Sequence, residues 1–518
     1  MLPWASIELL LGVCGAALDR TDKTLRRLYF VLKHLLILGG IFAVFLFLGS
    51  GKTHAGPFTY DEADYMYAVS LGWSANWMDS PALSLPEFIK AGLRGRAQNQ
   101  RADLSETIRD SNDVLFYRHW HGPIYAYWLR LVQPLALDER SVRRAGIVFP
   151  ALATILLYFG ALWLMPGRAG QIGAITASVL YLWSVPVVTT TELAPHQLFA
   201  VCVIAALLLL SKCLQASSSC RLYWYGALVA TGLAFCLLEV VFALVLTVLI
   251  CGYMIRDRLR PDLAFAAKSI GALLAPVAVF WPAAIFKLSS VKAYLFMAYL
   301  AVFRSAAWGN SVGFGPTWWL RFVNSPVLWI LLVIAIGFYV RNRSKVPLLT
   351  PFAVFSIMMA LAIFRVNSAT PRYTLPLLPG VVLLSAFATG MLAARIRPVL
   401  RLTTVVLICA AMFMTSWLYF RSSAPVPAGG AEALLAFLHE RGSSQRTLLV
   451  PHSDLPMLHY YFPKSRFKTY YDEAEIPEQI RSGALEGVIF HRLMPPAAGC
   501  SAEAAPQFNE IQFIVVCP

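Results

Sequence analysis

Two adjacent acids, Asp61 and Glu62, stand just past the first long apolar segment, within the aromatic stretch 58–65. Carboxylates are costly to hold near lipid, so their position calls for a functional explanation. A carboxylate at a membrane surface can accept the proton of an attacking hydroxyl group. We therefore take both acids as catalytic candidates. The alternatives are that Asp61 caps a helix and that Glu62 has a structural role.

Three further elements carry polar side chains that suit the same chemistry: Arg118, His119, His121 and Tyr125 in the first, Glu192 and His196 in the second, and Arg372 and Tyr373 in the third. A phosphate leaving group gains negative charge during transfer, so cations must meet it. The guanidinium fork of arginine binds two phosphate oxygens at once. Each element also has a structural interpretation, because interfacial histidines, solvated loop acids and arginines that anchor to headgroups are common. Glu192 and His196 are the weaker candidates.

The composition indicates a membrane protein. The chain has 518 residues, of which 58% are hydrophobic and only 14% are charged, whereas soluble domains carry roughly 25% charged residues. Long apolar runs recur from residue 28 to residue 420, which predicts a polytopic α-helical membrane protein. The net charge of +15 comes from short basic runs between apolar segments, a pattern typical of cytoplasmic loops rather than of nucleic-acid binding.

The charge pattern also predicts the topology. The apolar stretch 222–255 would be roughly 51 Å long as a helix, too long for one span and short for two. The basic clusters 256–260, 341–345 and 395–401 lie on the same side as 20–27 only if this stretch crosses twice, with a bend near Glu239. The prediction is about eleven transmembrane helices, a cytoplasmic N-terminus and an extracytoplasmic C-terminus.

The expected organisation has three parts: a cytoplasmic or interfacial segment 1–27, a transmembrane domain 28–420 and an extracytoplasmic α/β domain 421–518. The loops 50–142 and 287–325 lie outside and contain juxtamembrane helices, one of them over 60–77. In the tail, 447–450 and 487–490 are predicted strands, and 456–461 is a predicted helix between strands. Cys500 and Cys517 would form a disulfide if the tail is extracytoplasmic.

The order of these elements resembles the GT-C membrane glycosyltransferases, in the group of protein O-mannosyltransferases and bacterial aminoarabinose-type lipid A transferases. That group carries an Asp-Glu pair in its first outer loop, here Asp61-Glu62, and then a His/Lys-Pro-Pro-Leu-Tyr-Tyr-type motif, here 121–128. An arginine-rich segment follows at 140–144, and a late Arg-Tyr-x-Leu-Pro-x-x-Pro motif stands at 372–379. Gly122 replaces the first proline of the second motif, a departure that bears on the substrate more than on the family.

The resemblance implies a polyprenyl-phosphate sugar donor, inversion at the sugar carbon and a site that faces outward. It implies that Asp61 is the base or the acid that positions the acceptor, and that His121 and Arg372 contact the donor phosphate. It identifies no cofactor and leaves a requirement for a divalent metal open. The implied partners are the lipid-linked donor, a glycan, lipid or protein acceptor, and membrane lipids.

These observations favour a glycosyltransferase of the bacterial cytoplasmic membrane that modifies an envelope glycan or lipid. A protein O-mannosyltransferase-like enzyme is the alternative within the same class. A transporter or flippase of lipid-linked sugars would also explain the apolar segments, but it predicts acids at mid-membrane rather than outside the spans. A non-catalytic scaffold of a polysaccharide complex is the third class. The sugar and the acceptor stay open.

Overall fold

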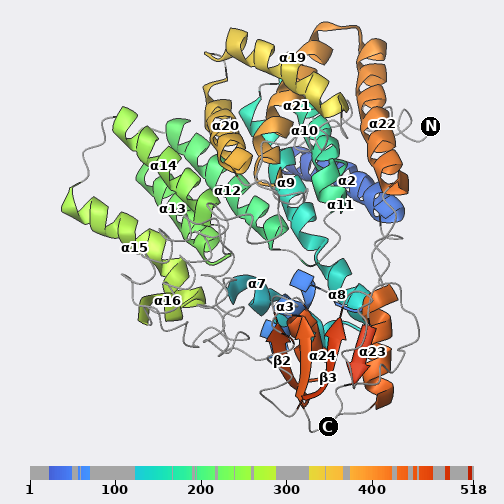
Figure 1. Cartoon of the computed structure of the whole chain (residues 1–518). Coiled ribbons are helices and arrows are strands. Elements are labelled where there is room, and N and C mark those ends of the chain that lie inside the picture. The colour runs from blue at the N-terminus through green and yellow to red at the C-terminus, as the bar shows by residue number, and fades with distance from the viewer. Residues whose placement is uncertain are drawn as a thin grey trace.

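The structure, a computed structural model, places a bundle of long helices above a small sheet, with short helices between them (Figure 1). It describes residues 23–49, 56–58, 60–70, 123–165, 167–189, 193, 195–215, 220–237, 240–257, 262–286, 326–344, 346–365, 374–422, 429–441, 447–451, 454–470, 476, 485–490 and 512–515.

The bundle consists of helices whose sequences are almost continuously apolar. In chain order they are α2 Lys23–Gly49, α9 Val148–Leu164, α10 Gly167–Leu182, α11 Val185–Thr189, α12 His196–Gln215, α13 Cys220–Phe235, α14 Val240–Arg256, α15 Leu263–Phe280, α16 Ala283–Phe286, α19 Pro326–Asn342, α20 Thr350–Arg365, α21 Leu378–Arg395 and α22 Pro398–Ser422, with the 3₁₀ turn η6 Pro347–Leu349 before α20.

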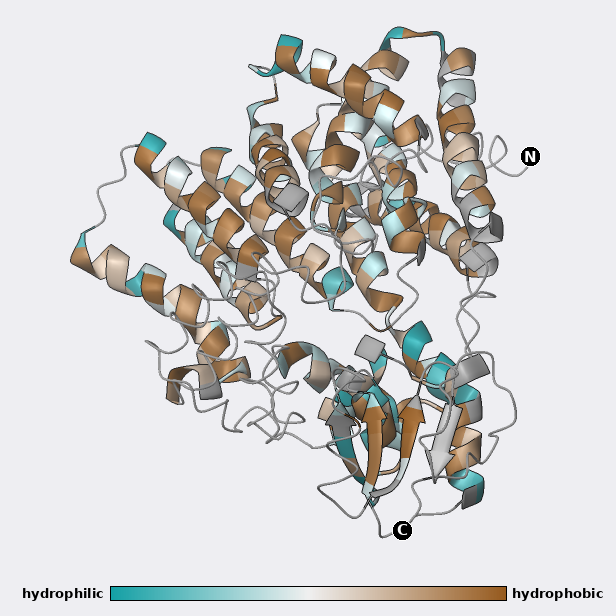
Figure 2. Cartoon of the chain, viewed as in Figure 1, coloured by the Kyte–Doolittle hydropathy of each residue, from teal (hydrophilic) through white to brown (hydrophobic). Residues whose placement is uncertain are grey.

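The outer faces of the bundle are suited to lipid. Within the described residues, five segments are long and apolar enough to cross a membrane: Leu28–Leu46, Glu139–Leu164, His196–Gln215, Leu263–Phe280 and Leu378–Arg395. Large apolar side chains such as Leu36, Val279 and Val333 are 63%, 71% and 68% exposed, and apolar residues cover the long helices in Figure 2. Exposure on this scale suits a bilayer and not water. The predicted class, a helical membrane protein, is confirmed, whereas the number of spans stays a prediction.

The apolar stretch 222–255 is divided as its length predicts. Helix α13 ends at Phe235, and α14 begins at Val240 and runs to Arg256. The two helices pack against each other, so the chain reverses between them. The predicted division of this stretch into two helices is therefore confirmed.

Small residues bring α10 and α21 close together. The buried faces of these two helices carry Gly170, Gly173, Ala174 and Ala177 on α10, and Ala386, Thr389, Gly390 and Ala393 on α21. A Cβ atom at Gly390 would overlap the backbone carbonyl of Ala169. Close backbone approach of this kind is the usual means by which helices associate in lipid, where the hydrophobic effect does not drive them together.

Between the bundle and the sheet lie α3 Tyr60–Ser70, α7 Pro123–Val132, the 3₁₀ turn η4 Gln133–Leu135 and α8 Glu139–Ala145. Asp138 is the N-cap of α8 and accepts a hydrogen bond of 2.8 Å from the Ser141 backbone N–H. Acidic Glu139 in the first turn, and Arg143 and Arg144 in the last, also match the helix dipole. The start of this short helix is thus fixed by its own sequence.

The described part of the tail contains a four-stranded sheet with the order β2-β1-β3-β4. The strands are β1 Thr447–Pro451, β2 Arg466–Tyr470, β3 Leu485–Phe490 and β4 Gln512–Val515, and the helices of this region are α23 Gly429–Arg441 and α24 Leu455–Tyr461. Strand β1 is parallel to β2 and β3, whereas β3 and β4 are antiparallel. Four successive buried residues in β1 are typical of a central parallel strand. The strands predicted at 447–450 and 487–490 and the helix predicted at 456–461 are confirmed.

Candidate active site

The helix that carries the acid pair is enclosed by protein. Ala63 and Met66 of α3 are fully buried, and Tyr65, Tyr67 and Val69 are nearly so. α3 packs against both α7 and α24. The sequence predicts a helix over 60–77 that lies at the lipid interface; within its described part, Tyr65 and Tyr67 contact the protein residues Tyr125 and His459, and the interfacial position stays a prediction. Enclosure on several sides gives α3 a defined position.

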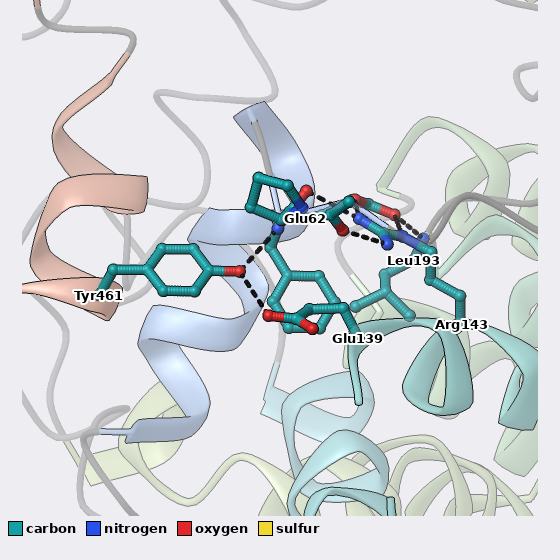
Figure 3. A network of polar contacts seen from close by, with 8 residues as sticks. Glu62, Glu139, Arg143, Leu193 and Tyr461 are labelled. Carbon is teal, nitrogen blue, oxygen red and sulfur yellow. Dashed lines mark hydrogen bonds and ion pairs between the residues drawn. The ribbon is translucent and has the colours of Figure 1, made fainter. Parts of the chain in front are cut away.

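Glu62 is held by a two-point ion pair with Arg143 of α8. Arg143 Nε donates to Glu62 Oε1 at 2.9 Å and Nη2 donates to Oε2 at 2.5 Å. The side chain of Arg143 is 2% exposed and that of Glu62 is 8% exposed. Figure 3 shows the guanidinium facing the carboxylate edge to edge. This fork geometry fixes both the distance and the orientation between α3 and α8.

The same arginine also fastens the chain that leads into α3. Its Nη1 donates to the Gly56 carbonyl at 2.7 Å, and its Nη2 donates to the Pro57 carbonyl at 3.0 Å. The guanidinium carbon lies 5.0 Å from the centre of the Phe58 ring. Because these groups lie three to five residues before Asp61, Arg143 fixes the backbone from which Asp61 projects.

The second sequence element reaches the same acid. The Leu193 backbone N–H donates to Glu62 Oε1 at 2.9 Å (Figure 3). Leu193 stands next to the candidate Glu192 and three residues before His196, which is buried at the start of α12. Both oxygens of Glu62 therefore accept hydrogen bonds, and the carboxylate joins α3, α8 and the chain before α12.

The first sequence element reaches α3 through Tyr125. This residue lies on α7, is buried, and its ring centre is 5.3 Å from that of Tyr65 in a T-shaped arrangement. Arg130, five residues further along α7, donates to the Val69 carbonyl at 2.7 Å. The structure thus brings the elements of Tyr125 and of Leu193 to the helix of the acid pair.

Several candidates lie outside the described residues: Arg118, His119, His121, Glu192, Arg372, Tyr373, Cys500 and Cys517. Asp61 is the second residue of α3, in the first turn, where a carboxylate also stabilises a helix; the position of its side chain is likewise outside the described part. Their predicted roles stay predictions. Within the described residues, no group of three or more His, Cys, Asp or Glu side chains has the arrangement of a metal site.

The sequence did not single out Arg143, Glu139 or Tyr461 as site residues. Arg143 belongs to the arginine-rich segment 140–144, but nothing in that run of basic residues distinguishes it from its neighbours. The signal available was the acid pair itself, because a buried carboxylate needs a cationic partner. Tyr461 and Glu139 interact across 322 positions, a separation at which sequence spacing gives no signal.

Comparisons with known proteins agree with this fold. Residues 120–286 match the sequence model of the dolichyl-phosphate-mannose-protein mannosyltransferase family, and a search of curated proteins found no match. ArnT from Cupriavidus metallidurans bound to undecaprenyl phosphate is similar in structure, with a TM-score of 0.57 and 14% identity over 93% of this chain and 98% of that one. The archaeal oligosaccharyltransferase AglB from Archaeoglobus fulgidus, in complex with an inhibitory peptide and a dolichol-phosphate, gives a TM-score of 0.51 and 11% identity over 88% of this chain and 69% of that one. The resemblance of the chain to the GT-C membrane glycosyltransferases, predicted from its motifs, is thereby confirmed.

Proposed function

We propose that this protein is a membrane glycosyltransferase that moves a sugar from a polyprenyl-phosphate donor to an envelope glycan or lipid, with inversion at the sugar carbon. The reaction would take place on the outer face of a bacterial cytoplasmic membrane, with the N-terminus inside and the C-terminus outside. The observation that carries the proposal is the rigid mounting of α3: its acid Glu62 is tied to Arg143 and Leu193, and its neighbour is Asp61.

The kind of donor is supported by the structural relatives. ArnT was captured with undecaprenyl phosphate and AglB with a dolichol-phosphate, two lipids that share a long apolar chain and a phosphate. A bundle with lipid-facing helices beside a fixed acidic helix suits such a donor, since the chain can stay in the bilayer while the headgroup meets the site.

The contacts of Glu62 support a division of roles within the acid pair. Glu62 is fully engaged in hydrogen bonds and serves as the anchor, so Asp61 is the acid left for chemistry. Asp61 accepts the proton of the acceptor hydroxyl as its oxygen forms the new bond to the anomeric carbon. The bond from that carbon to the donor phosphate breaks, and the polyprenyl phosphate leaves with the electron pair. Arg372 and His121, with Arg118, His119, Tyr125 and Tyr373 as further donor contacts, meet the charge that develops on the phosphate.

The test uses the purified full chain in lipid nanodiscs with polyprenyl-phosphate sugar donors and lipid or glycan acceptors. Wild type should release polyprenyl phosphate and form glycosylated acceptor, and Asp61→Asn should lower turnover by roughly 10²- to 10⁴-fold. The matched control is Asp257→Asn, because Asp257 pairs with the exposed Arg256 at the far end of α14. Turnover by Asp61→Asn equal to wild type would remove Asp61 from the mechanism. A wild-type protein that moves the donor across a membrane without forming product would favour the transporter.

A further inference from the structure

The sheet region, which comprises α23, α24 and the strands β1 to β4, contacts the acid-bearing helix α3 through the short helix α24. This helix connects the parallel strands β1 and β2 and packs against α3. Its last residues, His459, Tyr460 and Tyr461, are the ones that meet α3 and the chain before it. A crossover helix has a fixed place on its sheet, so its end can hold a neighbouring segment in place.

Tyr461 bridges two parts of the site. Its hydroxyl accepts a hydrogen bond of 2.9 Å from the Phe58 backbone N–H and donates one of 3.1 Å to Glu139 Oε1 of α8. Figure 3 shows the phenol reaching from α24 to both groups. Burial raises the pKa of Tyr461 well above that of free tyrosine, so the hydroxyl keeps the proton that it donates.

The neighbouring residues of α24 support the same contact. The Tyr460 ring meets the Phe58 ring edge-on with centres 5.7 Å apart, and His459 stacks on Tyr67 at 5.3 Å. Gln133 Nε2 lies 3.5 Å from the Tyr460 hydroxyl. Aromatic contacts of this kind align two surfaces, whereas the hydrogen bonds of Tyr461 fix one backbone position between them.

That backbone position is the one from which Asp61 is placed. Phe58 precedes Asp61 by three residues, and the Phe58 ring lies against the guanidinium of Arg143. Tyr461 holds the Phe58 amide from one side, while Arg143 holds the preceding carbonyls of Gly56 and Pro57 from the other. Loss of the contacts of either Tyr461 or Arg143 would leave the backbone before α3 less constrained.

We propose that Tyr461 is a positioning residue through which the sheet region sets the orientation of the Asp61-bearing segment. The proposal rests on the proposed function for its catalytic consequence, but the coupling between α24 and the segment 56–66 is a property of the structure alone. Nothing in the sequence motifs assigns a role to Tyr461, which lies outside the helical bundle.

The variant Tyr461→Phe removes both hydrogen bonds and retains the ring. The matched control is Tyr470→Phe, because the Tyr470 hydroxyl also makes a hydrogen bond, to the Ile489 carbonyl at 2.7 Å, but within the sheet. Two readouts are taken on the full chain in nanodiscs: hydrogen exchange of the backbone amides in 56–66, and kcat and KM for the donor. Tyr461→Phe should raise the exchange and lower kcat by about 10-fold each while KM changes little. Tyr470→Phe should change neither.

A second variant approaches the bridge from its other end. Glu139→Ala removes the acceptor of Tyr461, so it should reproduce part of the faster exchange in 56–66 and part of the loss of kcat. Glu139→Gln keeps an acceptor oxygen and should return the exchange and kcat towards the wild-type values. Combining Glu139→Ala with Tyr461→Phe should add little to Tyr461→Phe alone, because both act through one bridge. These variants also decide the matter if Tyr461→Phe does not fold.

Three results would overturn the proposal: exchange and kcat of Tyr461→Phe equal to wild type, faster exchange with kcat unchanged, or the same changes in Tyr470→Phe. The last would mean that any loosening of the sheet region has this effect. If the wild-type chain transfers no sugar, the proposed function fails. In that case the exchange comparison alone decides whether Tyr461 holds the segment.

Discussion

Replacing Arg143 by methionine should destabilise the protein more than breaking an ordinary ion pair. Arg143 makes two hydrogen bonds to the Glu62 carboxylate and two to backbone carbonyls, and its side chain is 2% exposed. Methionine has a similar length but no charge, so the buried Glu62 carboxylate would lose its cationic partner. Leaving one charge of a buried pair uncompensated costs about 3–5 kcal/mol.

A double variant separates the destabilisation caused by an unpaired buried charge from the stabilisation that the ion pair itself provides. In Glu62→Gln/Arg143→Met no buried charge is left, and the glutamine oxygen can still accept from the Leu193 N–H. The double variant should therefore be more stable than Arg143→Met alone, although it lacks the ion pair altogether. Arg143→Lys should fall between wild type and Arg143→Met, because a lysine ammonium cannot present the fork to Glu62 and also reach both carbonyls.

The assay is equilibrium unfolding in mixed detergent micelles, followed by the loss of helical circular dichroism. The matched control within the chain is Arg256→Met, since Arg256 forms an ion pair of 2.8 Å with Asp257 in which the two side chains are 58% and 32% exposed. Its loss should cost about 0–1 kcal/mol. If Arg143→Met unfolds like Arg256→Met, or if the double variant is the least stable of the set, the anchoring role of the Glu62–Arg143 pair is wrong.

Two further predictions concern the scaffold. Gly390→Ala should destabilise the chain by about 1–3 kcal/mol, because its Cβ would overlap the Ala169 carbonyl and force α10 and α21 apart. Gly337→Ala should not destabilise the chain, because its Cβ meets nothing within 4 Å. Equal unfolding of both variants in detergent would contradict the close packing of α10 and α21. Hydrogen bonds from Ser141 lower the pKa of the Asp138 carboxyl. The stabilisation by Asp138 is therefore present above the usual carboxyl pKa and is lost as the pH falls through the lowered pKa. Asp138→Ala should unfold more easily than wild type at neutral pH, and this difference should shrink in acid; a difference in stability that does not depend on pH would refute the capping role.

The bundle was predictable because its physical cause is local. A helix in lipid must satisfy its backbone hydrogen bonds internally and expose apolar side chains, so each span shows as an apolar run. The division of 222–255 followed from length and from the positions of basic residues, and α13 and α14 end and begin beside the predicted bend. The strands of the tail were predictable for a related reason, since buried parallel strands are short continuous apolar runs.

The site was predictable only in part, because its contacts join distant residues. The acid pair could be picked out from the sequence because holding two carboxylates near lipid costs free energy. In the structure, Tyr125 and the segment at Leu193 contact α3. Which acid is anchored could not be read from the sequence, because adjacent side chains on a helix point in directions about 100° apart and only the packing decides which one is buried. The contribution of α24 was also hidden, since nothing near Tyr461 in the sequence refers to α3.

Arg143 and Tyr461 hold the segment before Asp61 by contacts of different physical character. Arg143 acts through buried charge, which tolerates little movement before its cost rises steeply. Tyr461 acts through neutral and charge-assisted hydrogen bonds at a half-buried hydroxyl, contacts that can be broken at modest cost. The segment before Asp61 is therefore held more firmly by Arg143 of α8 than by Tyr461 of α24.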